Sequence, residues 1–388
     1  MEQRISVRGI AYAAGAADLQ NALATVYEMP ERPLCLCVRG GVPMYVAKHS
    51  QYLAKRMPET GHQHHPSCPC YEPEAGQSGL GALVGESIIE HAADSIELRV
   101  DFPLARMPGR PIARGEATEP GEVIAPRHEM SLRAVMHLLF ERAGFNRWYP
   151  AMQGKRNQGV VHRYLMDAAG EMTTKGVRLS DRLYVPEPFS EGRKGELAER
   201  RRSKFALLHS PQDDVAFKMA LVLGELKASE SSVFGRRIWI KHMPDTPLSM
   251  DSKSWERVER IYGILLQARE VDPSLRLIMC ALIYAKREHT YQIDTLNLML
   301  TTEQWIPLEG IHEVDLVQAL IENKRRFLKP LRYDARSAAL FPNALLLDTG
   351  DRPTPLHAVS PFMEGKERVL KEKTIKAQAN WRIRRGCG

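Results

Sequence analysis

A chain of 388 residues that is 44% hydrophobic and 26% charged, with a formal net charge of +7, fits a globular protein and excludes an intrinsically disordered one. At about 100–200 residues a domain, this length predicts two or three domains. No run of about 18 apolar residues is present, and residues 1–20 lack the basic start and apolar centre of a secretory signal. We therefore expect a cytoplasmic protein without membrane contact, whose six cysteines stay reduced.

The first segment, residues 1–78, combines short strand-like pieces at 34–38 and 43–47 with a group of cysteines and histidines. Cys35 and Cys37 lie two residues apart on the first piece, so their side chains share one face of a strand. About 25 residues further on, a turn-forming stretch supplies five more candidate ligands: His62, His64, His65, Cys68 and Cys70.

A structural zinc ion takes four tetrahedral ligands, typically two from each of two short motifs. We expect Cys35 and Cys37 to form one pair. His65 and Cys68 form the other, since the two residues between them let one turn present both, and Cys70 is an alternative in the C-x-C spacing. His62 and His64 remain open as the ligand that completes the site. The pattern predicts a Zn²⁺ module over residues 1–78; the competing interpretation is buried thiols beside a polar loop.

Residues 79–189 predict a central α+β domain. Alternation from Ile96 to Leu104 predicts a half-buried strand, and the Pro- and Gly-rich stretch 103–126 predicts a long loop. Ser131 is a suitable N-cap for a helix that ends at Gly144, and a second helix is expected over 158–169.

Between these two helices lies an aromatic and cationic stretch, Phe145–Tyr149 followed by Lys155 and Arg156. Such residues can stack on exposed bases while the cations bind phosphates. Packing of Trp148 and Tyr149 beneath the following helix is the alternative, and we favour it.

Residues 190–210 predict a basic linker with a helix inside it, and residues 211–388 an α/β domain. In that domain we expect strands at 236–242 and 275–285 and helices at 256–268 and 313–327. Two further strands, at 343–349 and 355–359, are joined by a turn. Strands and helices mix without strict alternation, so the predicted class for the whole chain is α+β.

Two basic runs favour a polyanionic partner. The linker contains Arg200, Arg201 and Arg202, and the tail 366–388 carries a net charge of +6. We expect nucleic acid as the partner, DNA in preference to RNA; a solvated helix face is the alternative for each run. The tail cations singled out as phosphate contacts are Lys371, Lys373, Arg382, Arg384 and Arg385.

Five phrases are spread over most of the chain: Cys-Leu-Cys at 35–37, His-His-Pro-Ser-Cys at 64–68, Ala-Gly-Phe-Asn-Arg-Trp at 143–148, Thr-Glu-Gln-Trp-Ile-Pro at 302–307 and Arg-Phe-Leu-Lys-Pro-Leu-Arg-Tyr at 326–333. Together they resemble the family catalogued as domain of unknown function 1173, which is encoded on bacterial plasmids and integrative conjugative elements. The resemblance implies a mobile-element setting, with other mobile-element proteins as partners, and no known activity.

Residues 313–373 also resemble, more faintly, the core of the PD-(D/E)xK nucleases, the restriction-endonuclease-like type, in which two carboxylates hold Mg²⁺ beside a lysine. The matching pieces carry Glu313 on a helix, Asn343 in place of the aspartate and His357 in place of the second carboxylate, and Val359 stands where the lysine belongs. These departures predict a site that does not cut.

A second nuclease candidate is Glu225-Leu226-Lys227, with Asp213 or Asp214 upstream. We predict a non-catalytic nucleic-acid-binding protein with a structural zinc site. The alternatives are a metal-dependent nuclease that uses Asp214, Glu225 and Lys227, and a protein–protein adaptor.

Overall fold

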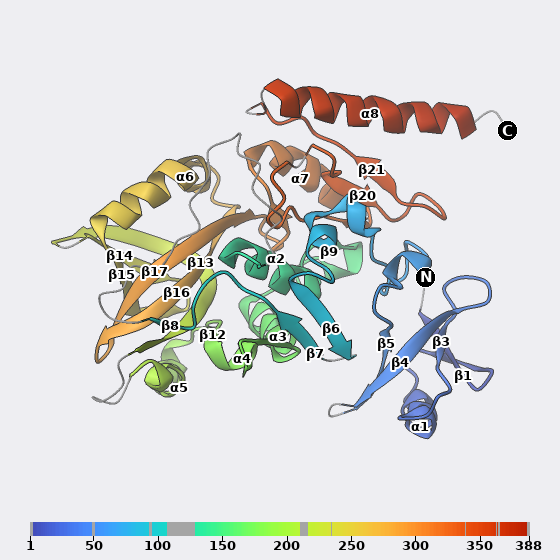
Figure 1. The fold of residues 1–388 in the computed structure, drawn as a ribbon, viewed down its shortest axis with the longest axis horizontal. Helices are drawn as coiled ribbons and strands as arrows, with labels where there is room; N and C mark the ends of the chain where they lie inside the picture. Colours follow the sequence, from blue (N-terminus) through green and yellow to red (C-terminus); the bar gives the residue numbers. More distant parts are fainter. Residues whose placement is uncertain are drawn as a thin grey trace.

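The computed structural model describes residues 3–48, 51–92, 95–106, 129–209, 216–233, 235–337, 339–361, 363 and 365–385. Figure 1 shows a small N-terminal unit beside a larger body of sheets and helices, with helix α8 lying along the upper edge of that body. Helices and strands are mixed rather than strictly alternating, which confirms the predicted α+β class.

The N-terminal unit is an antiparallel five-stranded sheet in the order β2-β1-β3-β4-β5, with α1 packed on it. It has its own apolar core, in which Ile5, Leu23 and Met44 pack with Cys35 and Cys68. The bounds are β1 Arg4–Val7, β2 Ile10–Ala13, α1 Ala17–Val26, β3 Leu34–Cys35, β4 Val42–Lys48 and β5 Tyr52–Arg56.

The largest sheet is built around β13, a strand of 16 residues. Residues 219–225 of β13 pair with β16 and residues 226–232 pair with β14, so the order β13-β14-β15-β17-β16 returns to β13. Short strands β8, β12 and β18 extend its margins. The bounds are β8 Ala105–Arg106, β12 Leu183–Tyr184, β13 Phe217–Ser232, β14 Gly235–Ile240, β15 Met243–Met250, β16 Arg276–Arg287, β17 Thr290–Thr301 and β18 Pro307–Leu308.

Helix α2 (Leu132–Arg142) contacts β16 and β17 of this sheet and is buried over most of its length. Its predicted caps are confirmed: Ser131 Oγ accepts a hydrogen bond from the Ala134 amide, and Gly144 has a φ of 75°. Helix α3 (Gln158–Gly170) packs on α2 and is capped by Asn157. Two further helices follow, α4 Leu179–Arg182 and α5 Lys194–Phe205.

Two smaller sheets complete the body, in the orders β11-β10-β7-β6 and β21-β20-β19-β9. The expected strand at 96–104 is shorter than predicted, since β7 ends at Leu98, although Val100, Phe102 and Leu104 remain buried. The bounds are β6 Ile88–Ala92, β7 Ser95–Leu98, β9 Arg147–Trp148, β10 Met172–Thr174, β11 Val177–Arg178, β19 Phe327–Leu328, β20 Ala344–Leu346 and β21 Thr354–Leu356.

The remaining helices are α6 (Ser252–Val271), α7 (Val314–Glu322) and α8 (Gly365–Arg385). The helix expected over 313–327 ends earlier, because Lys324 has a φ of 53°, a left-handed conformation that a helix does not continue through. The chain then enters β19. Among the described residues, no helix combines the length and apolar character that a membrane span requires.

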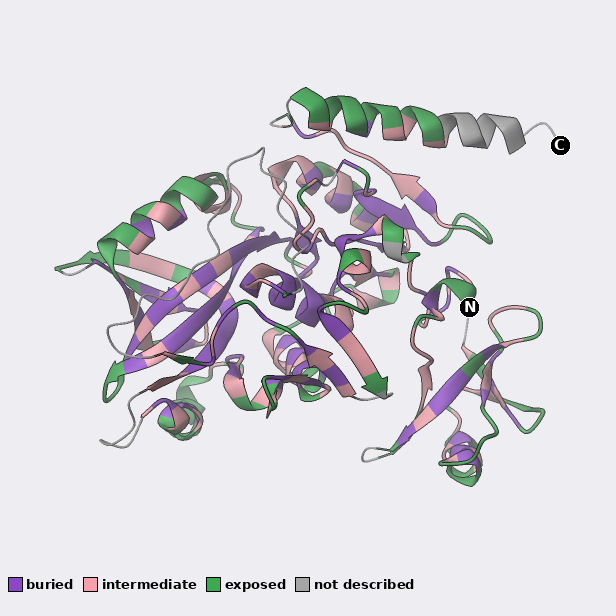
Figure 2. Cartoon of the chain, in the orientation of Figure 1, coloured by how far each residue is buried: buried purple, intermediate pink, exposed green. Residues whose placement is uncertain are grey.

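The expected boundary at 189/190 does not separate two cores. Leu139 of α2, Cys280 of β16 and Leu331 belong to a single apolar cluster, and β9 pairs with β19 across the same boundary. Figure 2 shows this shared interior as the buried residues of α2, β16 and β17. Most of the loop predicted at 103–126, from 107 onward, lies outside the described residues.

Candidate functional site

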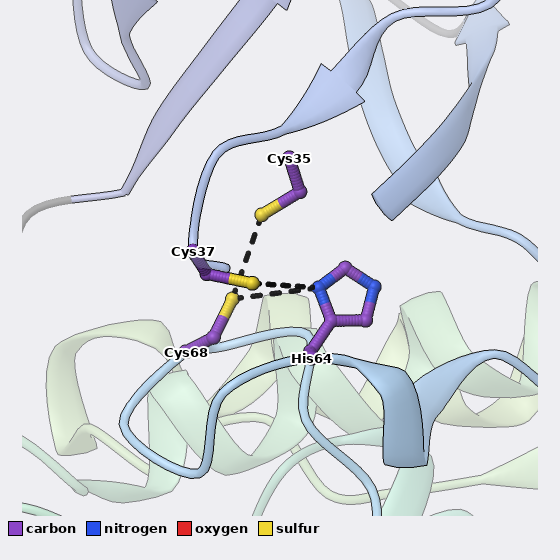
Figure 3. A group of neighbouring side chains, drawn as sticks. All are labelled: Cys35, Cys37, His64 and Cys68. Carbon is purple, nitrogen blue, oxygen red and sulfur yellow. Dashed lines mark hydrogen bonds between the residues drawn. The ribbon is translucent and has the colours of Figure 1, made fainter. Parts of the chain in front are cut away.

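Four side chains of the N-terminal unit converge on one point: Cys35, Cys37, His64 and Cys68 (Figure 3). Their ligand atoms all lie within 4.8 Å of one another. The Sγ atoms of Cys35 and Cys68 are 3.7 Å apart, and His64 Nδ1 lies 3.3 Å from Cys37 Sγ and 3.8 Å from Cys68 Sγ. These four residues could hold a metal ion.

The spacing of the four atoms is compatible with a tetrahedral ion. Zn–S bonds of about 2.3 Å place two sulfurs of a tetrahedron about 3.8 Å apart, and a Zn–N bond of about 2.0 Å shortens the S···N edge to about 3.5 Å. The separations of 3.7, 3.3 and 3.8 Å match three of these edges, and the other ligand atoms lie within 4.8 Å of one another. Three thiolates and one imidazole are also a ligand set that structural zinc sites use.

Two backbone amides support the cysteine ligands. The amide of His65 donates to Cys37 Sγ at 3.5 Å, and the amide of Cys70 donates to Cys68 Sγ at 3.4 Å. Amide donors stabilise the thiolate form, which is the form that binds a metal. Without a metal, burial raises the pKa of Cys37. Contrary to expectation, Cys37 lies in a turn, because β3 ends at Cys35.

His64, rather than His65, faces this cluster. The backbone at His64 is extended, with φ −76° and ψ 153°, so neighbouring side chains point in opposite directions. The His65 ring turns toward Ser67, whose Oγ lies 2.8 Å from Nδ1, and toward Asp351. His64 is 2% exposed, and its buried Nε2 has no hydrogen-bond partner among the described residues.

The two other candidate ligands lie outside the group of four. Gln3 Nε2 donates to Cys70 Sγ at 3.3 Å, and the neighbouring Cys35 thiol, together with burial, raises the pKa of Cys70 to about 11. His62 is exposed. Cys70 therefore lies beside the centre, where its amide donates to Cys68 and its thiol accepts from Gln3. The four candidate ligands do not include it.

Arg147, which was not expected at the metal centre, ties residues 64–70, the metal loop, to the body. Its Nη1 donates to the Pro69 carbonyl at 3.0 Å and its Nη2 to the Tyr71 carbonyl. Arg147 lies on β9, which pairs with β19, so the loop is tied to a sheet of the body. The signal in the sequence was the family phrase at 143–148, which contains this arginine.

A second cluster joins the pieces of the faint nuclease resemblance. Glu313 and Lys329, each 1% exposed, form an ion pair of 2.9 Å, and the Asn343 amide donates to the same carboxylate at 2.6 Å. Lys371 of α8 donates to the Phe341 carbonyl at 2.7 Å and to Asn343 Oδ1 at 3.1 Å. Burial lowers the pKa of Lys371 to about 8. Neither Lys329 nor Lys371 lies at the lysine position of the Glu-x-Lys pattern.

His357, the third residue of that resemblance, does not join the cluster. Its Nε2 lies 2.7 Å from Gln378 Oε1 of α8, and burial lowers its pKa. A cleft of about 520 Å³ opens beside the cluster, lined also by Arg133 and Glu309, which form an ion pair of 2.8 Å.

In the second nuclease candidate, both oxygens of Glu225 are bound by cations. Lys241 lies 3.0 Å from one and Arg276 lies 2.8 Å from the other. Lys227 is exposed on the same strand. Asp213 and Asp214 lie outside the described residues.

The two basic runs differ in how their charges are neutralised. On α5, Arg200 pairs with Glu187 and Glu196, and Arg202 pairs with Glu199. Arg201 is 3% exposed and pairs with Asp245. The expectation that Arg201 and Lys371 contact phosphates is therefore wrong. Arg201 is buried beside Asp245 and Lys371, 2% exposed, is buried beside Phe341, so neither presents its charge at the surface.

On the outward face of α8, three lysines lack an acidic partner among the described residues. Lys366, Lys373 and Lys376 are exposed, and none forms an ion pair with a described residue. Arg382, Arg384 and Arg385 continue the same helix, and their side chains lie outside the described part.

Comparison with protein families identifies the chain. The model of the family described as Protein of unknown function (DUF1173) matches residues 5–384, and the chain belongs to that family. Neither the curated proteins nor the solved structures contain a match. The function therefore has to be argued from the side chains.

Proposed function

We propose that the protein is a non-catalytic nucleic-acid-binding protein of a bacterial mobile element, with DNA in preference to RNA as its partner. The observation that carries this proposal is the outward face of α8, on which Lys366, Lys373 and Lys376 are exposed and unpaired among the described residues. Exposed cations release condensed counterions when they meet phosphates, which favours binding without reading sequence.

The metal centre in this proposal holds a structural Zn²⁺. Four protein ligands complete a tetrahedron and leave no open position for a water or a substrate. The ion would fix the loop 64–70 against β3, and Arg147 transmits that order to the body. Cytoplasmic conditions keep the three cysteines reduced and available to the metal.

The absence of catalysis is proposed from the charges around the two acidic sites. A Mg²⁺ ion for phosphodiester hydrolysis needs acidic oxygens that are open to it. Glu313 is taken by Lys329 and Asn343, and Glu225 by Lys241 and Arg276. In both places a protein cation stands beside the carboxylate.

One observation favours an adaptor as the second candidate function. Val369 and Leu370 are 66% and 37% exposed on the same helix that carries the lysines. Apolar side chains on an exposed helix are typical of a protein-binding face when they are grouped. Other proteins of the mobile element are the expected partners.

The test uses two triple variants of the full chain with the same change in charge. Lys366→Gln, Lys373→Gln and Lys376→Gln alter the α8 face. The second variant, Arg193→Gln, Arg200→Gln and Arg202→Gln, alters arginines of α5 and of the residue just before it, each of which already pairs with a glutamate. We expect the α8 variant to bind a duplex DNA about tenfold or more weakly at 0.1 M salt, because about three phosphate contacts are lost. Equal losses in both variants would contradict an α8 interface.

A further inference from the structure

A cavity of about 710 Å³ lies between the metal loop and the body. It is lined by the loop residues Pro66–Pro69 and by residues of β9 and α3. Cavities of about 300–1,000 Å³ hold ligands of the size of a nucleotide. The metal centre thus shapes one side of a space that the proposed function has not yet used.

The lining is aromatic in a way that packing alone does not explain. Tyr149 and Tyr164 both line the cavity and are 42% and 50% exposed, although each carries a large ring. Trp148 lines it as well and is 1% exposed, which agrees with the packing role expected for this residue. Its buried indole N–H, however, has no acceptor among the described residues. Because this N–H is also closed to solvent, Trp148 belongs to the wall of the cavity and is not a ligand contact.

Two cations of the lining are available to an anion. Lys155 is exposed, Arg326 is half-buried, and neither side chain has an ion pair among the described residues. Arg156 differs, because its guanidinium donates to the Phe145 and Gln304 carbonyls and lies over the rings of Phe145 and Trp148. Arg156 therefore builds the wall, whereas Lys155 and Arg326 remain for the ligand.

We propose that this cavity binds one unpaired nucleotide of a single-stranded segment. The base stacks on the exposed tyrosine rings, and the buried Trp148 closes the floor of the space beneath it. The adjoining phosphate lies on Lys155 and Arg326. This assignment rests on the proposed function and adds to it a preference for unpaired strands, while α8 contacts phosphates of either form.

The experiment compares a 20-nucleotide oligothymidine with a duplex of equal length, by fluorescence anisotropy on the full metal-loaded chain. The double variant Tyr149→Ala, Tyr164→Ala removes the stacking rings, and Tyr149→Phe, Tyr164→Phe keeps them as a matched control. We expect the alanine variant to bind the single strand about tenfold or more weakly and the duplex within about twofold of the original chain. The phenylalanine variant should bind both as the original chain does.

Each other outcome has a definite meaning. An unchanged single-strand affinity in the alanine variant, or equal losses for both probes, overturns the cavity assignment and leaves the proposed function standing. Absence of binding to either probe by the original chain overturns the proposed function and the cavity assignment with it. Competition by free thymidine monophosphate at micromolar concentration would assign the cavity to a soluble nucleotide and overturn the assignment to a strand.

Discussion

Lys371 Nζ lies 3.1 Å from Oδ1 of Asn343, so a buried ammonium joins helix α8 to the segment that leads into β20. Most residues of the helix are polar. Among its described side chains Lys371 is the buried one, on a face with the half-buried Glu367 and Gln378. One buried lysine therefore positions the helix, while other lysines give its exposed face a positive charge.

Replacement of Lys371 should destabilise the fold, unlike replacement of its neighbour. Lys371→Met removes hydrogen bonds to Phe341 and Asn343 and should lower the free energy of unfolding by about 1–3 kcal/mol. Lys373→Met, on the exposed face, should change it by no more than about 0.5 kcal/mol. Urea denaturation of both variants measures the difference, and equal midpoints would show that Lys371 does not hold the helix.

Adjacent histidines should differ in their effect on metal content. Purified chain is expected to carry about one zinc, and His64→Ala should lose most of it because a ligand of the tetrahedron is removed. His65→Ala should keep the metal, since its ring faces Ser67 and Asp351. Cys68→Ser should behave like His64→Ala and also unfold the N-terminal unit, because metal binding and local folding are coupled. Elemental analysis decides; loss of zinc in His65→Ala alone would reverse the assignment.

The free energy of unfolding should fall as the pH rises from about 4 through 7, because of Glu141. Burial raises the pKa of Glu141 to about 7, although the hydrogen bond from Tyr333 opposes the shift. The folded chain thus keeps a proton that the unfolded chain, with a pKa of about 4.3, releases. This contribution is complete below about pH 4 and is lost through pH 7, by at most about 4 kcal/mol.

Glu141→Gln should remove that dependence, because an amide does not titrate and still accepts the Tyr333 hydroxyl. The exposed Glu322→Gln is the control and should retain the decline. Unfolding free energies measured at pH 5 and pH 8 give the comparison. A decline of the same size in Glu141→Gln would place its origin in another group.

The chain should not cut nucleic acid with Mg²⁺ or Mn²⁺. Asn343 offers one neutral oxygen, which already accepts from Lys371 and the Ala358 amide, and His357 bonds to Gln378. Assays on single- and double-stranded DNA and RNA should show no product above background. Cleavage that vanished in Glu225→Ala and survived His357→Ala would establish the nuclease alternative.

The sequence predicted what depends on short-range pattern. Ser131 and Gly144 bound α2 as capping chemistry requires, and Cys35, Cys37 and Cys68 lie at one centre. The choice between His64 and His65 depends on one backbone rotation, which ligand spacing does not determine. The sequence did not distinguish Lys371 from the exposed lysines of the tail, because Lys371 is buried against polar groups of Phe341 and Asn343, which are distant in the sequence. The shared core of 79–189 and 211–385 results from long-range strand pairing, such as β9 with β19.

The salt dependence of DNA binding shows whether the lysines of α8 contact phosphates. For the full chain and a duplex DNA, a plot of log affinity against log salt should have a negative slope of about 0.9 for each phosphate contacted. In the Lys366→Gln, Lys373→Gln, Lys376→Gln variant we expect that slope to be smaller by about 2.7 at unchanged thermal stability. A slope near zero in the original chain, or an identical slope in the variant, would contradict nucleic-acid binding through α8.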